Sequence, residues 1–138
     1  MGASDLATGA LDELLAAAPR DVEALQSCLD AEFEALRERR IDDFEALQPR
    51  KIDLLERLAL ASQYARSRAP TPVVWQQLED ALIKSRDAHL RNAQLLRRQL
   101  DAVRATLQTL QGEPPSSGVY DRLGQMAYGR LRGGYQSA

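Results

Sequence analysis

The chain has 138 residues, carries a formal net charge of −2, and contains only one His and one Cys. This inventory excludes a disulfide framework and most metal sites. None of the eight glycines lies between Gly9 and Gly112, and Leu occupies 22 positions against 12 for Val, Ile and Thr together. Such a composition favours helix over a long stretch, so β-sandwiches, barrels and glycine-rich nucleotide folds are excluded.

The first expected helix runs from about Asp5 to Arg40, where apolar residues recur at helical spacing. Pro19 removes one backbone donor and crowds the preceding turn, so the sequence predicts a break or kink between a short leading helix and the main one. A turn is expected at residues 39–43, because arginines at the end of one helix and aspartates at the start of the next suit the helix dipole.

The second expected helix runs from about Asp42 to Ser67. Pro49 lies inside it and should bend its first third. The prolines at positions 70 and 72 end this helix, since a residue that precedes proline avoids the α region.

The third expected helix is the longest, because nothing breaks the pattern from about Pro72 to Gln111. A continuous helix of about 40 residues extends roughly 60 Å. Gly112 suits the position just after its end. Its apolar residues alternate by three and four positions, and Ser85, His89 and Asn92 interrupt this coiled-coil-like face.

These elements predict an all-α protein: an elongated antiparallel three-helix bundle with a very long third helix and a flexible C-terminal tail. The expected division is a helical bundle domain over residues 1–112 and a flexible partner-binding tail over residues 113–138. Because the third helix is longer than its partners, part of its apolar stripe is expected to be uncovered. Self-association through this helix, or a partner helix, covers such a stripe.

Residues 113–138 differ in kind, with five of the eight glycines and three of the four tyrosines of the chain. Glycine disfavours an isolated helix here, yet the segment is too apolar for a solubilising tail. A flexible backbone with spaced aromatic and aliphatic anchors is typical of segments that order on binding a partner. The predicted substrate-binding residues of the tail are Val119, Leu123, Met126, Tyr128 and Leu131.

The candidate catalytic side chains lack the neighbouring groups that acid–base or nucleophilic catalysis requires. His89 has no second His and no Cys nearby, which indicates a polar residue of the helix seam. Cys28 is expected to be a small core side chain, since a reactive thiol needs an activating neighbour. Paired carboxylates are interpreted as solvated helix faces: Glu32 with Glu34, and Asp42 with Asp43. The sequence therefore predicts no enzyme activity, no catalytic or metal site, and no cofactor.

The third helix has a basic side, formed by Lys84, Arg86, Arg91, Arg97, Arg98 and Arg104. A phosphate-binding stripe for nucleic acid is one interpretation, but the net charge of −2 and the absence of neighbouring aromatic residues disfavour it. The preferred interpretation is that these residues pair with the acidic faces of the first two helices. Trp75, at the start of the third helix, is expected to close the end of the bundle.

The sequence also predicts a cytoplasmic location. Its longest uncharged run, residues 69–78, is far shorter than the roughly 20 apolar residues that span a bilayer. The N-terminus lacks the basic start and apolar stretch of a secretion signal. We therefore expect no insertion into a membrane.

Several short motifs follow one another along the chain. Residues 119–125 are VYDRLGQ and residues 130–134 are RLRGG, after a long helix and a Pro-containing linker. Two runs lie upstream in the first two helices: Lys51 with Leu54, Leu55 and Leu58, and residues 30–32 with Leu36. In order and spacing these motifs resemble the FlgN family of flagellar export chaperones over essentially the whole chain. Asp121, where Gly is common, and Pro49 depart from the family pattern.

The resemblance implies a cytoplasmic chaperone of flagellar type III export. Such a protein binds the hook-filament junction proteins FlgK and FlgL, protects their C-terminal amphipathic helices from aggregation, and delivers them to the export gate protein FlhA. The resemblance implies docking on this gate by Tyr120, with Gly124 and Gln125 beside it. The alternative, from a different class, is a generic coiled-coil adaptor or oligomerisation module whose partner is unrelated to secretion.

Overall fold

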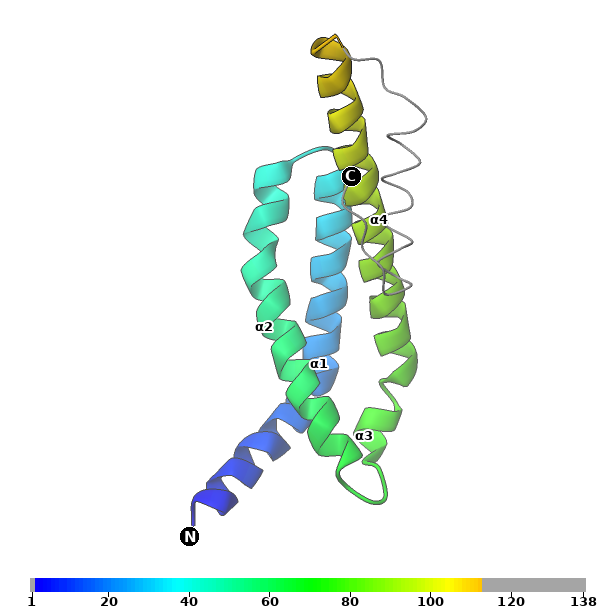
Figure 1. The fold of residues 1–138 in the computed structure, drawn as a ribbon. Helices are drawn as coiled ribbons and strands as arrows, with labels where there is room; N and C mark the ends of the chain where they lie inside the picture. The colour runs from blue at the N-terminus through cyan, green and yellow to red at the C-terminus, as the bar shows by residue number, and fades with distance from the viewer. Residues whose placement is uncertain (1, 113–138) are drawn as a thin grey trace, which may run out of the picture. The chain divides into compact units, whose positions relative to one another are not determined.

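The computed structural model describes residues 2–112, and every element in this range is a helix (Figure 1). The helices are α1 (Ala3–Arg37), α2 (Ile41–Arg66), α3 (Val73–Gln76) and α4 (Glu79–Leu110). The all-α prediction is confirmed for these residues. The chain divides into two compact units, residues 1–96 and residues 97–138, so that α4 begins in the first and ends in the second.

The single long third helix that the sequence predicts is wrong at its start. The structure has the short helix α3 and then a turn at Gln77 and Leu78 before α4 begins. In this turn the Leu78 N–H donates to the Trp75 carbonyl oxygen at 3.0 Å, three residues back. Trp75 and Leu78 are both buried in the core, so tertiary packing outweighs local helix propensity here. At the other end Gly112, with φ +83°, follows α4 as predicted.

The predicted interruption at Pro19 is a bend and not a break. Helix α1 continues through this proline, as α2 continues through Pro49. Figure 1 shows the first turns of α1, in dark blue, running at an angle to the rest of the helix. Leu15 and Val22, on either side of Pro19, are both buried, and their packing holds the helix together where one backbone hydrogen bond is missing.

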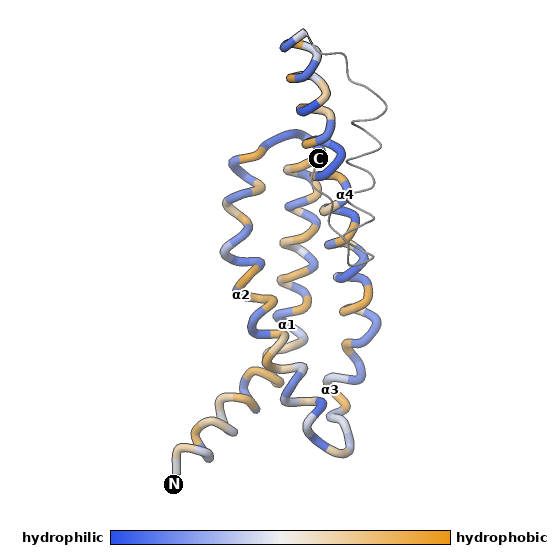
Figure 2. The backbone as a smooth tube through the Cα atoms, in the orientation of Figure 1, coloured by the Kyte–Doolittle hydropathy of each residue, from blue (hydrophilic) through white to orange (hydrophobic). Residues whose placement is uncertain are grey.

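The core of the first unit lies mainly between α1 and α2, which run antiparallel (Figure 1). Figure 2 shows hydrophobic positions recurring along each helix between hydrophilic ones, which is the pattern of an amphipathic helix. The core is aliphatic, and Trp75 is the one aromatic residue that is buried within residues 2–112. Helix α4 differs, because its buried residues are the polar Ser85 and Asn92.

A three-residue turn joins α1 to α2. The Arg40 N–H donates to the Ala35 carbonyl oxygen at 2.7 Å, and the Arg39 N–H donates to the Leu36 carbonyl oxygen at 3.1 Å. These are the two hydrogen bonds of a Schellman motif, whose C′ residue adopts the left-handed conformation. Here that residue is Arg39, with φ 60°, and not the usual glycine.

Replacing Arg39 by Gly is expected to raise the free energy of unfolding by about 0.5–1 kcal/mol, because a side chain disfavours positive φ. Urea denaturation followed by circular dichroism measures the change. Arg39→Ala is the matched control: it removes the same charge and keeps the Cβ atom, so no gain is expected. Equal stabilisation by both variants would assign the effect to charge and not to the backbone.

Candidate functional site

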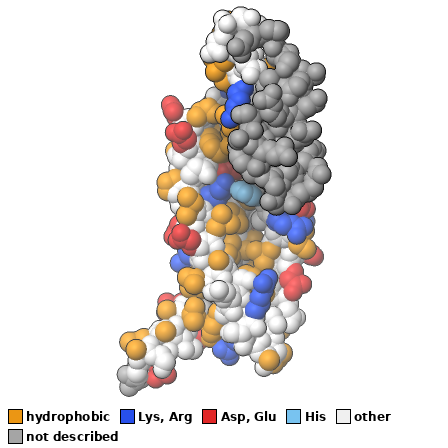
Figure 3. All heavy atoms as spheres, viewed as in Figure 1, with side chains coloured by type: hydrophobic (Ala, Val, Ile, Leu, Met, Phe, Trp, Pro, Cys, Tyr) orange, Lys and Arg blue, Asp and Glu red, His pale blue; other side chains and the backbone are white. Residues whose placement is uncertain are grey.

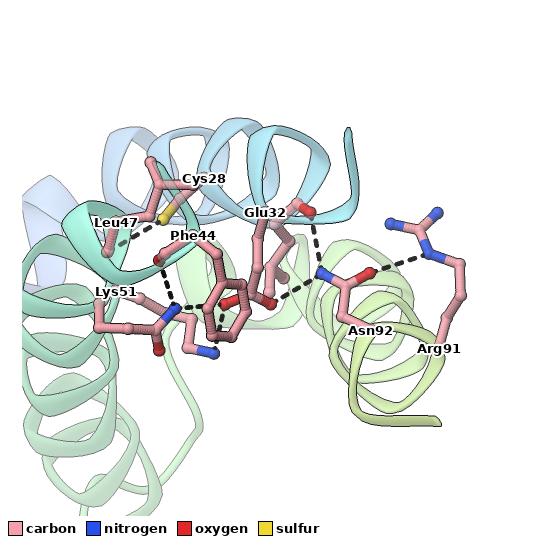
Figure 4. Close-up of polar contacts among 9 residues, drawn as sticks. Cys28, Glu32, Phe44, Leu47, Lys51, Arg91 and Asn92 are labelled. Carbon is pink, nitrogen blue, oxygen red and sulfur yellow. Dashed lines mark hydrogen bonds and ion pairs between the residues drawn. The ribbon is translucent and has the colours of Figure 1, made fainter. Parts of the chain in front are cut away.

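A buried polar cluster joins three helices of the first unit (Figure 4). Its centre is the carboxylate of Glu32 on α1, which is only 1% exposed. Lys51 Nζ and Gln48 Nε2, both on α2, each lie 2.8 Å from Glu32 Oε2. Asn92 on α4 donates through Nδ2 to Glu32 Oε1 at 2.8 Å and to the Leu29 carbonyl oxygen at 2.9 Å. Both oxygens of the carboxylate are therefore hydrogen-bonded, and one side chain links α1 to α2 and to α4.

The prediction that Glu32 lies on a solvated helix face is wrong, because this residue is buried. The same prediction is confirmed for Glu34, which is about half exposed and pairs with Arg37. The sequence held a signal for this difference. Glu32 lies between Leu29 and Leu36 at spacings of three and four, so it occupies the apolar seam of α1. Lys51 occupies the equivalent position of α2, between residues 47 and 54. Opposite charges at seam positions of two adjacent helices indicate a buried pair.

Burial and hydrogen bonding act in opposite directions on Glu32. Burial raises the pKa of its carboxyl, but hydrogen bonds from Lys51, Gln48 and Asn92, with the positive charge of Lys51, outweigh it and hold the pKa below the ordinary value. The charged form is thus favoured in the folded chain more than in the unfolded one. It stabilises the fold at pH values above the ordinary Glu pKa of about 4.3.

This stabilisation is expected to disappear as the pH falls from about 4.3 through the lower pKa of the folded state, where the carboxyl becomes protonated. Over that window the unfolding free energy of the wild-type chain should fall more steeply than that of Glu32→Gln. Urea denaturation at a series of pH values between 3 and 7 gives both curves. Parallel curves would show that Glu32 does not contribute to the acid sensitivity.

The other two candidate catalytic residues, Cys28 and His89, lie in different environments. Cys28 is buried, as predicted, and its Sγ lies 3.8 Å from the Leu47 carbonyl oxygen. Burial, followed by the nearby charge of Glu32, raises the pKa of this thiol, which opposes reactivity. His89 is exposed on α4, and Trp75 is buried in the core. Within residues 2–112 no cluster of His, Cys, Asp or Glu is suited to a metal ion.

The predicted pairing of the basic side of α4 with the first two helices holds for one residue. Arg91 Nη2 lies 3.9 Å from Asp30 Oδ1 on α1. The guanidinium carbon of Arg91 lies 4.0 Å from the centre of the Phe33 ring. Arg86 instead lies 3.5 Å from Asp87 on its own helix. The contacts of Arg91 position α4 against α1 near the buried cluster.

A groove opens on the first unit between α2 and α4, and we call it the α2–α4 groove. Its volume is about 370 Å³. Buried apolar residues form its floor, while exposed residues of α2 and α4 form its rim. Figure 3 shows hydrophobic side chains gathered on this face beside basic ones and the single His. The floor includes Leu25, Leu29, Leu58 and Trp75, and the rim includes Leu55, Arg66, Arg86 and His89.

A second apolar surface lies on the part of α4 that belongs to residues 97–138. Four residues spaced by three and four positions are each at least half exposed, and we call them the α4 stripe: Leu100, Val103, Leu107 and Leu110. Isolated exposed leucines are normal, but an ordered row of them is typical of a surface that another helix covers. This agrees with the predicted uncovered stripe of the third helix.

The predicted tail sites lie outside the described residues, both the proposed gate-docking residues and the proposed substrate-binding residues: Tyr120, Gly124 and Gln125, and Val119, Leu123, Met126, Tyr128 and Leu131. None of the helices that the structure describes has the length and hydropathy to cross a membrane. Comparisons with family models, with curated proteins and with solved structures give no significant match.

Proposed function

We propose that the chain is a cytoplasmic flagellar type III export chaperone of the FlgN type, without enzyme activity. In this proposal it binds FlgK and FlgL, prevents their aggregation, and delivers them to the export gate protein FlhA. Helices α1, α2 and the first part of α4 form an antiparallel three-helix bundle. The chain after residue 96 binds the client protein, which is FlgK or FlgL. The observation that carries the proposal is the α4 stripe.

The client proteins in this proposal are FlgK and FlgL before their secretion. An amphipathic helix that is exposed before secretion presents an apolar face that promotes aggregation. The α4 stripe offers a complementary face, because apolar residues at i, i+3, i+7 and i+10 suit side-by-side packing of two helices. Residues 113–138 follow directly in the sequence and contain the apolar and aromatic anchors that their composition and spacing predict for substrate binding. A segment that orders on binding keeps affinity moderate and release possible.

Co-expression with the C-terminal segment of FlgK tests this proposal. The full chain is expected to keep the segment soluble and to co-purify with it, while the variant Leu100→Glu/Leu107→Glu loses it. Leu90→Glu is the matched control, because Leu90 lies on the same helix outside the α4 stripe and is 52% exposed. Circular dichroism checks that all variants remain helical. Co-purification of the stripe variant at the wild-type level would contradict the assignment of the client to this surface.

The gate-docking role of Tyr120 needs a separate experiment. Tyr120→Ala is expected to leave the FlgK complex intact and to weaken binding to the cytoplasmic part of FlhA. Pull-down of both partners with the same variant measures the two effects together. Loss of FlgK with FlhA binding retained would assign Tyr120 the opposite role.

The second candidate function is a coiled-coil adaptor or oligomerisation module, and the three-four spacing of the α4 stripe favours it. In that case the stripe pairs with a second copy of the chain or with an unrelated helix. Light scattering of the free chain distinguishes the two functions: a dimer that Leu100→Glu/Leu107→Glu converts to a monomer indicates the module. A wild-type monomer that captures FlgK indicates the chaperone.

A further inference from the structure

We propose that the α2–α4 groove is a docking site for an acidic amphipathic helix of a partner protein. This inference goes beyond the proposed function, which places the client on residues 97–138. The groove belongs entirely to residues 1–96. Its partner is defined by chemistry: a helix with an apolar face and with acidic residues along the edges of that face.

The floor of the groove accounts for the apolar face. Leu25, Leu29 and Leu58 are buried at 3%, 1% and 5% exposure, yet they line a groove with room for additional side chains. Leu55 stands at the edge with 43% of its surface exposed. Apolar side chains inserted between α2 and α4 would remove Leu55 from water and make van der Waals contacts with the floor, and both effects favour association.

The length of the groove suits a helix of about two to four turns. Its lining extends from Lys51 to Arg66 on α2 and from Leu82 to His89 on α4, and these separations correspond to about 22 Å and about 10 Å along the helix axes. A partner helix of about 15 residues has the length of the α2 side. Its apolar face would lie on a surface bounded on both sides by helices, which is the helix-in-groove mode of recognition.

The charges on the rim of the groove indicate which sign of charge the partner helix carries along its edges. Arg66 stands on the α2 side, and Arg86 and His89 stand on the α4 side. None of the described residues that line the groove is acidic. Lys51 adds little, because its charge is paired with Glu32, whereas the contact of Arg86 with Asp87 is a highly exposed one and remains open to exchange. Acidic edges on the partner therefore complement the rim, and basic edges oppose it.

A second copy of the chain is a poor occupant of the groove. Two grooves facing each other would oppose their arginines. The α4 stripe of another copy is flanked by three arginines and one aspartate: Arg97, Arg98, Arg104 and Asp101. It would therefore bring a net positive charge toward Arg66 and Arg86. Like charges that face each other across an interface disfavour pairing.

The test uses two synthetic peptides of 18 residues and the full chain. Both peptides carry Leu at helical spacing on one face, with Glu along the edges in one and Lys in the other. Fluorescence anisotropy measures their binding. The Glu peptide is expected to bind at least tenfold more tightly than the Lys peptide at 50 mM salt, and the difference should shrink at 500 mM because surface charges are screened. Equal binding of the two peptides overturns the proposal.

Variants locate the binding on the groove. Leu55→Glu and Arg86→Glu are expected to weaken binding of the Glu peptide at least tenfold. Arg86→Glu should also strengthen binding of the Lys peptide. Leu60→Glu and Lys84→Glu are the matched controls, because they lie on the same helices outside the groove lining and are exposed. Arg86→Gln replaces Arg86→Glu if circular dichroism shows that the latter is unfolded. Equal effects of groove and control variants overturn the proposal.

Two further measurements separate this inference from its alternatives. The stripe variant Leu100→Glu/Leu107→Glu is expected to bind the Glu peptide as the wild-type chain does. If it loses the peptide, the peptide binds the α4 stripe and the inference is wrong, whatever the outcome with FlgK. If Leu55→Glu changes the mass in light scattering and leaves peptide affinity unchanged, the occupant is a second copy. If only the FlgK experiment fails, the proposed function is wrong and the peptide result for the α2–α4 groove is unaffected.

Discussion

Replacing Glu32 by Leu is expected to lower the free energy of unfolding by about 3–5 kcal/mol, because the partner charge of Lys51 is then left buried without compensation. Asn92 loses a hydrogen-bond acceptor in the same variant, which adds to the cost. Urea denaturation at pH 7 measures the loss. The size of the effect reflects the burial of the pair, with side-chain exposures of 2% for Glu32 and 10% for Lys51.

Two controls define the origin of this loss. Glu34→Leu removes a carboxylate two residues away that pairs at the surface, and exposed pairs of this kind contribute less than about 1 kcal/mol. The double variant Glu32→Leu/Lys51→Met is expected to recover much of the stability, since replacing both buried charges by apolar groups removes the uncompensated one. A double variant as unstable as Glu32→Leu would show that the lost acceptor, and not the unpaired charge, dominates.

Replacing Leu54 by Ala is expected to lower the free energy of unfolding by about 2–5 kcal/mol, because it opens a cavity at a position with no exposed surface. Leu55→Ala removes the same atoms from the next residue, which is 43% exposed, and should cost less than about 1 kcal/mol. Urea denaturation of the two variants gives the comparison. Equal losses would mean that α2 presents a different face to the core.

The sequence predicted α1 and α2 well, because their boundaries depend on local signals. The observed ends, Arg37 and Arg66, lie within three residues of the expected ones. Helical spacing of leucines and the prolines after position 69 fix these limits without reference to the rest of the fold. The break between α3 and α4 could not be predicted in this way. It depends on the burial of Trp75 and Leu78 in a core cluster that they share with residues of α1 and α2.

The candidate surfaces differ in the same respect. The α4 stripe is visible in the sequence as a row of apolar residues at spacings of three and four, and only its exposure requires the structure. The α2–α4 groove is not visible, because its lining comes from four helices. No single periodic pattern contains the juxtaposition of Arg66 with Arg86. Glu32 is an intermediate case, since its seam position was visible and its charge concealed the burial.

The short turn at Arg39 has a consequence for the order of folding. The contacts between α1 and α2 that lie nearest the three-residue link join residues close in sequence, such as Glu32 and Lys51, which are 19 positions apart. This end of the hairpin therefore closes with little loss of chain entropy. During synthesis α1 and α2 leave the ribosome first, and Glu32 can meet Lys51 before Asn92 has left the ribosome. In this hairpin Glu32 Oε2 is paired with Lys51, whereas Glu32 Oε1 accepts its hydrogen bond only when Asn92 is in place. The docking of α4 on α1 is therefore expected to be a late step of folding, completed when Asn92 reaches Glu32.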